Sequence, residues 1–177
     1  MGMQTLAAAL EREHREIDAG IESFTSGSRA GDALSLSGAI QALRRHIYLE
    51  EEFLFPSLRT GAPAPALAAA VPVMLREHGQ MWDVLDLLER EIVTASRGET
   101  ALTLCRQLMD MLSPHHLKEE EILYAAADDL LTRAAEVRLR GFLAYARLPG
   151  GWSSEMAQHS NSHSQASTAR LFNTRDC

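Results

Sequence analysis

The sequence contains little that would indicate a secreted, nucleic-acid-binding or membrane protein. Only two of its 177 residues are cysteines, Cys105 and Cys177, which is too few for a disulfide framework and favours the reducing cytosol. The formal net charge of −7 gives no electrostatic support for nucleic-acid binding. No apolar run approaches the roughly 18 residues of a membrane span, and the N-terminus lacks the basic segment of a signal peptide. We therefore expect a cytoplasmic protein that binds neither nucleic acid nor membranes.

What the sequence does contain indicates an all-helical chain. Apolar residues make up 46% of it but aromatic residues only 6%, and leucine and alanine dominate over β-branched residues. The length suits one domain with a core of its own. Apolar residues at helical spacing predict helices over residues 3–25, 33–55, 66–96, 99–127 and, as a short fifth helix, 130–146.

Glycine, proline and aspartate mark where these helices should begin, bend and end. Asp32 can cap the second helix, and Pro56 is expected to stop it. Pro72 predicts a kink or a fresh start within the third helix, and Pro114 a bend in the fourth. Residues 153–170 are rich in serine, glutamine, asparagine and histidine and lack apolar periodicity. We therefore predict a helical domain over residues 1–147 and a polar, disordered tail over residues 148–177.

A motif of histidine followed at plus four by glutamate occurs twice. In each copy a second glutamate comes next, and an apolar–aromatic pair stands at plus eight and plus nine from the histidine. The two copies are His46, Glu50, Glu51, Leu54 and Phe55, and His115, Glu119, Glu120, Leu123 and Tyr124. Residues four apart on a helix lie on one face, so each histidine–glutamate pair should point into the core.

A second repeated feature turns these motifs into an internal repeat. Arg12-Glu13-His14 precedes the first motif, and Arg76-Glu77-His78 precedes the second. Each half of the chain is thus one helix with a single histidine, followed by one helix with the histidine–glutamate pair. Two such hairpins packed face to face predict an antiparallel, up-down four-helix bundle.

The repeat brings six polar side chains to one level of the predicted core, where burying them unpaired would cost several kcal/mol. A bound metal would remove that cost. Imidazole and carboxylate without thiolate suit iron, manganese or zinc. Six ligands exceed the needs of one tetrahedral zinc but fit two metals that share two carboxylates. The predicted ligands are His14, His46, Glu50, His78, His115 and Glu119.

Neighbouring histidines and glutamates leave alternatives open. The apolar register selects His115 and Glu119, and the shifted alternative is His116 with Glu120. The other glutamates beside the motifs are expected outside the ligand set, as solvent-exposed residues or as partners of the ligand imidazoles; these are Glu13, Glu51, Glu52, Glu77, Glu120 and Glu121.

These motifs resemble the hemerythrin-like, or HHE cation-binding, domain family over roughly residues 3–147. The resemblance implies a helical bundle with an oxo- or hydroxo-bridged pair of iron ions that binds dioxygen, nitric oxide or peroxide, or that handles iron. One departure concerns the third helix, where oxygen-carrying hemerythrins have two histidines one turn apart. Here Met74 and Trp82 flank His78 at that spacing, so the set of four histidines is closer to bacterial proteins linked to nitrosative stress and iron-centre repair.

The expected function is binding of one of these small ligands in sensing, scavenging, storage or iron handling, with electrons from an unidentified redox partner. One alternative is a di-iron enzyme, such as a peroxidase, a nitric oxide reductase or an iron-centre repair protein. The other is a metal-free helical interaction module. Neither a catalytic acid nor a catalytic base stands out beyond the predicted ligands.

Overall fold

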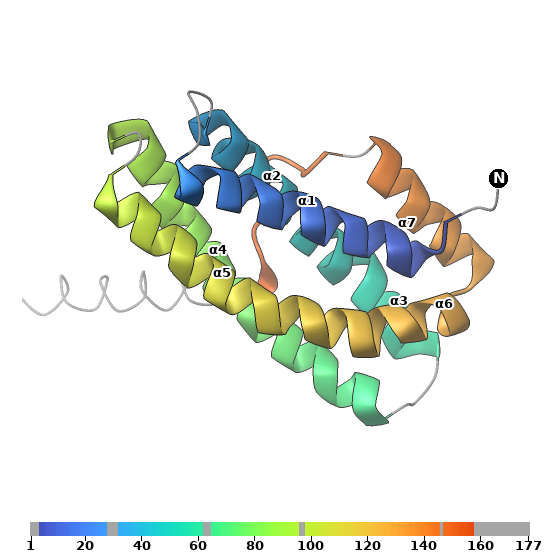
Figure 1. Ribbon diagram of the computed structural model, residues 1–177. Helices are drawn as coiled ribbons and strands as arrows, with labels where there is room; N and C mark the ends of the chain where they lie inside the picture. Colours follow the sequence, from blue (N-terminus) through green and yellow to red (C-terminus); the bar gives the residue numbers. More distant parts are fainter. Residues whose placement is uncertain (1–3, 28–31, 62–64, 96–97, 146, 158–177) are drawn as a thin grey trace, which may run out of the picture.

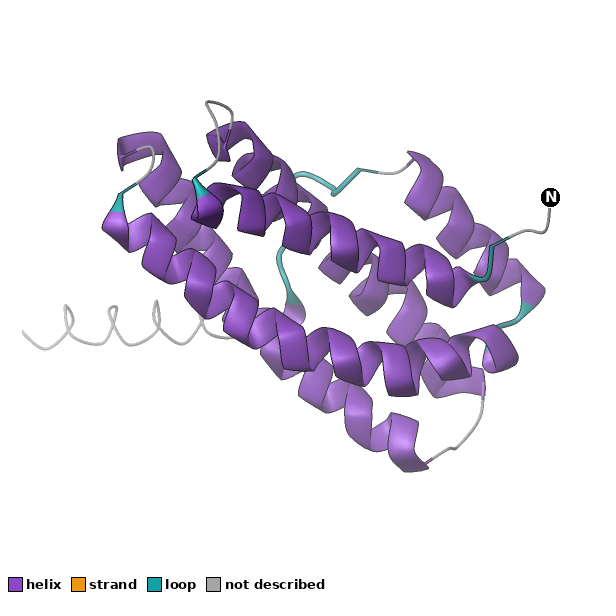
Figure 2. Cartoon of the chain, in the orientation of Figure 1, coloured by secondary structure: helices purple, strands orange, loops and turns teal. Residues whose placement is uncertain are grey.

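The structure is a computed structural model that describes residues 4–27, 32–61, 65–95, 98–145 and 147–157 (Figure 1). Within these ranges all regular structure is helical and no strand occurs, which confirms the predicted all-α class (Figure 2). In chain order the elements are α1 (Leu6–Ser26), α2 (Asp32–Leu49), the π-helix η1 (Glu50–Leu54), α3 (Phe55–Gly61), α4 (Pro65–Ala95), α5 (Glu99–Lys118), the π-helix η2 (Glu119–Tyr124), α6 (Ala125–Leu130) and α7 (Arg133–Tyr145).

Four long helices form the bundle. Helix α1 packs against α2 and α5, and α4 packs against α5 and α2, so the two hairpins close into a ring (Figure 1). Thr5 caps the start of α1 by accepting a hydrogen bond from the backbone N–H of Ala8, and Gly27 ends the helix in the left-handed conformation at φ 71°. Gly20 lets α1 approach α2 closely, because a Cβ atom there would lie 2.8 Å from the Cβ of Ala39.

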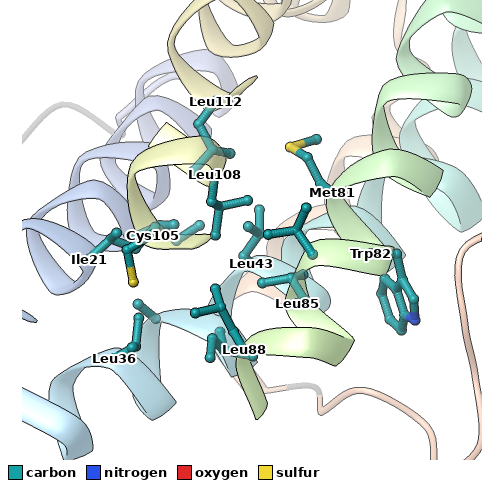
Figure 3. Packing of buried hydrophobic residues seen from close by; sticks show 14 of the residues in the cluster. Ile21, Leu36, Leu43, Met81, Trp82, Leu85, Leu88, Cys105, Leu108 and Leu112 are labelled. Atoms are coloured by element: carbon teal, nitrogen blue, oxygen red, sulfur yellow. The ribbon is translucent and has the colours of Figure 1, made fainter. Parts of the chain in front are cut away.

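The apolar core consists of two clusters, one toward each end of the bundle. In α1, for example, Leu10 belongs to one cluster and Ile17 to the other, and His14 lies between them. The same division occurs in α4, where His78 lies between Met74 and Met81. Figure 3 shows side chains of one cluster pointing toward one another from different helices. The polar layer that contains the histidines therefore crosses the bundle between two dry apolar layers.

Pro56 does not end a helix, and the prediction that it would was wrong. The backbone passes from α2 through η1 into α3, and the N–H of Phe55 bonds to the carbonyl of Glu50 in the π-helical pattern. Pro56 is then the second residue of α3, directly after the π-helix, and the helix continues through it. Helix α4 continues through Pro72, so no new helix begins there.

Part of the predicted tail is ordered against the bundle. Residues 147–157 follow α7 and return along the bundle, where Ser154 and Ala157 are buried. Gly79 provides the space for this segment, because a Cβ atom there would lie 2.7 Å from the Cβ of Met156. The prediction of disorder from residue 148 was therefore wrong for residues 148–157, and the rest of the predicted tail lies outside the described residues.

None of the helices described above combines the length and the apolar character that crossing a lipid bilayer requires.

Candidate metal centre

The six predicted ligands lie together in the polar layer. Helices α1, α2, α4 and α5 each contribute one imidazole, and the two π-helices contribute the carboxylates at their first residues. All six residues are at most 2% exposed; they are His14, His46, Glu50, His78, His115 and Glu119. The predicted repeat thus places one histidine on each long helix at a common depth.

The first half of the cluster is formed by His14 and His46 with the two glutamates. Their inward nitrogens, Nε2 of His14 and Nε2 of His46, are 3.0 Å apart. His14 Nε2 lies 3.3 Å from Oε2 of Glu119, and His46 Nε2 lies 3.4 Å from Oε1 of Glu50. One donor atom from each of the four residues falls within 4.8 Å of all the others, which is the spacing of a cation site.

The second half repeats this arrangement with His78 and His115. His115 Nε2 lies 2.9 Å from Oε1 of Glu119, and His78 Nε2 lies 3.3 Å from Oε2 of Glu50. These four residues form a second set of donors within 4.8 Å of one another. The two sets share Glu50 and Glu119, and each carboxylate turns one oxygen toward each half. The two donor sets therefore overlap at their two carboxylates, and each set could hold a cation.

Each imidazole is oriented by a carboxylate on its outward nitrogen. The Nδ1 atom of every cluster histidine lies 2.7–3.0 Å from a glutamate oxygen; the pairs are His14 with Glu120, His46 with Glu13, His78 with Glu51 and His115 with Glu77. An ionised carboxylate can only accept hydrogen bonds, so Nδ1 carries the proton in each pair. Such outer partners fix the ring and raise the basicity of the inward nitrogen.

The inward atoms fit a cation because their own hydrogen bonds do not satisfy them. In the neutral state of an imidazole, with its proton on Nδ1, the Nε2 atom faces its neighbours and the carboxylates as a bare lone pair. Oε2 of Glu50, Nε2 of His78 and Oε1 of Glu119 are buried and lack an aligned hydrogen-bond partner among the described residues. Buried polar atoms are rarely left in this state. Positive charge in the centre of the cluster would satisfy all of them.

The pKa values of the cluster histidines also indicate that the centre of the cluster favours positive charge. Burial opposes charge on His46, but the carboxylates of Glu50 and Glu13 outweigh it and raise its pKa to about 10. The pKa values of His78 and His115 are also raised against the effect of burial, by Glu119 and the other carboxylates that face them. Without metal, protons on the imidazoles supply the positive charge that a cation would otherwise provide.

The alternative pair, His116 and Glu120, lies outside both donor sets. The His116 ring stacks on His14 with centroids 3.7 Å apart, and its Nδ1 faces Asp18 at 3.5 Å. Burial lowers the pKa of His116, so the imidazole is held neutral. Glu120 instead supports His14 from outside the cluster. The structure therefore places His115 and Glu119 in the centre and gives their neighbours supporting positions.

The segment of residues 147–157 supports one histidine of the second half. Glu51, which accepts from Nδ1 of His78, is also contacted by the Ser154 hydroxyl at 2.8 Å and the backbone N–H of Glu155 at 2.9 Å. Trp152 donates to Glu52 in the same region. Sequence reasoning missed this support, because only the fold brings residues about a hundred positions apart together.

Tyr124 also reaches the centre of the cluster, and the sequence predicted it only as one member of an apolar–aromatic pair. In an ordinary α-helix, position plus five from Glu119 would lie about 140° away from it around the axis. Here η2 is a π-helix that begins at Glu119 and ends at Tyr124, and its wider turn brings both side chains to the same side. The two glutamates of each motif give no warning of a π-helix in the sequence.

Comparison with known proteins identifies the family. The family model of the hemerythrin HHE cation binding domain matches residues 5–127, which covers α1 through the start of α6. Searches of the curated proteins and of the solved structures found no match to this chain. Buried histidine and glutamate groups within this range make the chain a metal-binding helical domain. The chain belongs to the hemerythrin family of HHE cation-binding domains.

Proposed function

We propose that this domain holds two iron ions between its hairpins and binds dioxygen, nitric oxide or peroxide there. The observation that carries the proposal is the pair of overlapping donor sets that share Glu50 and Glu119. Each set offers two imidazole nitrogens and one oxygen from each carboxylate, fewer donors than the six of an octahedral ion. The choice of iron rests on the family resemblance, because the donor types alone also suit manganese or zinc.

The residues around the proposed iron pair orient its ligands and keep water out of the site. His14, His46, His78 and His115 are held by their Nδ1 partners, so their inward nitrogens stay aimed at the centre. The two apolar clusters cover the layer from both ends and exclude water. Iron bound there would supply electrons and open coordination positions to a small ligand. The protein's part is to keep both available in a pocket of low polarity.

Binding is favoured over turnover because, apart from Tyr124, few other ionisable groups are buried beside the donor sets. Among the described residues, the buried charged side chains outside the donor sets include Arg44 and His116. Arg44 is occupied by Asp86 and Glu89, and His116 faces Asp18. We therefore propose a role in sensing, scavenging, storage or iron handling in the cytoplasm, with an unidentified redox partner that reduces the metal.

Mixing the reduced, iron-loaded protein with dioxygen, nitric oxide or peroxide tests this proposal. The ultraviolet–visible spectrum should change with at least one of them, with one equivalent bound per iron pair. Continued consumption of peroxide or nitric oxide at steady state would instead identify an enzyme. A chain that takes up iron but gives no spectral response to any of the three would contradict the proposed ligand-binding function.

A further inference from the structure

The hydroxyl of Tyr124 lies in the centre of the first donor set. It is 2.6 Å from Oε1 of Glu50, 2.9 Å from Nε2 of His14, 3.0 Å from Nε2 of His46 and 3.4 Å from Oε2 of Glu119. The side chain is fully buried. A phenol oxygen therefore lies within hydrogen-bond distance of one donor atom from each residue of this set.

One phenol cannot satisfy four such neighbours. The Nδ1 protons of His14 and His46 are used by Glu120 and Glu13, so both inward nitrogens are acceptors when these imidazoles are neutral. The carboxylate oxygens are acceptors as well. The phenol has a single hydrogen to donate and can satisfy one of the four. A cation among these five atoms would be attracted by all of them.

Among the described residues, no tyrosine hydroxyl matches it at the second donor set. In the internal repeat, Tyr124 stands nine residues after His115, and Phe55 stands nine residues after His46. Phe55 is buried and its ring stacks on His78, with centroids 5.6 Å apart. Both aromatic residues are placed by a π-helix, Tyr124 as the last residue of η2 and Phe55 directly after η1. The halves therefore differ in one oxygen atom at equivalent positions.

We propose that Tyr124 is a further protein ligand of the cation held by His14 and His46, and that it makes the two iron sites chemically different. The inference rests on the proposed function, because it requires iron in the first donor set. As the bond between the phenol oxygen and the ferric ion forms, the O–H bond breaks and its proton leaves to solvent, with no change in oxidation state. This ligand occupies a position at the first site and leaves the second site, beside Phe55, the more open.

The visible and resonance Raman spectra of the ferric protein test the proposal. The full-length chain is loaded with ferrous salt in air, and its iron content is measured on the same sample. A phenolate bound to ferric iron should give a charge-transfer band in the visible, and excitation in that band should enhance tyrosine ring vibrations. The Tyr124→Phe variant should lose the band and these vibrations while it keeps two irons per chain, and far-UV circular dichroism checks its fold.

The other two tyrosines provide matched controls. Tyr48 packs against Phe53 and Trp152, and Tyr145 is 90% exposed. The double variant Tyr48→Phe/Tyr145→Phe leaves Tyr124 as the single tyrosine of the chain and should keep the band. Ring-deuterated tyrosine in this variant should shift the enhanced vibrations, which gives a result even if Tyr124→Phe fails to fold.

Two results would overturn the role of Tyr124. One is a chain with two irons and no tyrosine vibrations, and the other is a band that persists in Tyr124→Phe or is lost in the double variant. The first of these leaves the iron pair intact, so it separates this inference from the proposed function. A chain that binds no iron overturns both.

Discussion

The two halves of the bundle have the same inner histidine and glutamate donors and differ in what surrounds them. Each half contributes two histidines and one shared glutamate, and the outer partners follow the repeat as well. His46 and His115 are supported by the glutamate before the other histidine of their own half, Glu13 or Glu77. His14 and His78 are supported instead by the glutamate after the shared carboxylate of the opposite half, Glu120 or Glu51.

Two of these partner pairs form contacts between the hairpins. Because two of the four imidazoles depend on a carboxylate from the other half, neither hairpin can complete its own site. Two differences separate the halves. Tyr124 enters the first donor set where Phe55 faces the second, and residues 147–157 contact Glu51, the outer partner of His78. The two halves therefore combine the same inner donor residues with different surroundings.

Removing a shared carboxylate should reduce metal binding in both halves, because each proposed site loses a donor. We expect Glu50→Ala or Glu119→Ala to lose most of the bound metal from both halves, as measured by metal content per chain. Glu121→Ala is the matched control, since this neighbouring glutamate is exposed and should leave loading nearly unchanged. Equal metal content in all three variants would contradict the ligand assignment.

Chelation should destabilise the bundle, because it removes the cations that we propose lie between the two halves. Metal at about 100 times its dissociation constant contributes about 2.7 kcal/mol to stability. A protein of this size loses roughly 2–4 °C of melting temperature per kcal/mol, so chelation should lower Tm by about 5–10 °C. Thermal unfolding followed by circular dichroism measures the shift. An unchanged Tm after complete removal of metal would argue against a buried site.

A substitution outside the proposed ligand set should lower the metal affinity of one half and leave that of the other half unchanged. Glu51→Gln leaves the inner donors in place but weakens the charged partner of His78 and its contacts with Ser154 and the Glu155 N–H. Loss of such an outer partner typically costs about 10–100-fold in metal affinity. We expect this loss for one of the two bound ions in a titration that resolves them.

Glu52→Gln is the control for this experiment, because Glu52 contacts Trp152 and no cluster histidine. It should leave both affinities close to those of the wild type. If Glu51→Gln weakened both ions equally, the two halves would not be separate sites.

The pH dependence of stability should differ between the metal-free and metal-loaded forms. The pKa of His46 is raised from 6.5 to about 10 when metal is absent, so its contribution is complete below pH 6.5 and is lost as the pH rises through about 10. The pKa values of Glu50 and Glu119 lie below their ordinary 4.5 despite burial, because of the imidazoles, so their contribution is lost only in acid.

Metal binding uses unprotonated imidazole, so raising the pH strengthens it. The gap in Tm between loaded and chelated protein should therefore widen by a few degrees as the pH rises above 6.5. Melting curves across this range measure it, and a gap that narrows would contradict the protonation of His46 in the metal-free cluster.

The sequence predicted the inner cluster well because regular spacing determines it. His46 with Glu50 and His115 with Glu119 need only helical periodicity to share a face, and the repeated Arg-Glu-His segments placed His14 and His78 opposite them. The fold class followed from the same periodicity. What the sequence could predict was thus the part of the site that local geometry controls.

The missed features depend on backbone changes and on long-range contacts. Tyr124 was missed because the π-helix η2 shifts the register that an α-helical projection assumes. Pro56 was expected to stop a helix because proline usually does, but the chain continues from η1 into α3. Residues 148–157 were expected to be disordered because their composition is polar, yet Ser154 and Trp152 are held by glutamates of η1. Such contacts have no signature in local periodicity.

Metal content per chain tests the central claim most directly. The full-length protein is reconstituted anaerobically with excess ferrous salt, freed of unbound metal and analysed by plasma mass spectrometry against its protein concentration. Two shared carboxylates between four buried imidazoles predict two iron ions per chain. A chain that retains no metal, or that saturates with a single ion, would contradict the account.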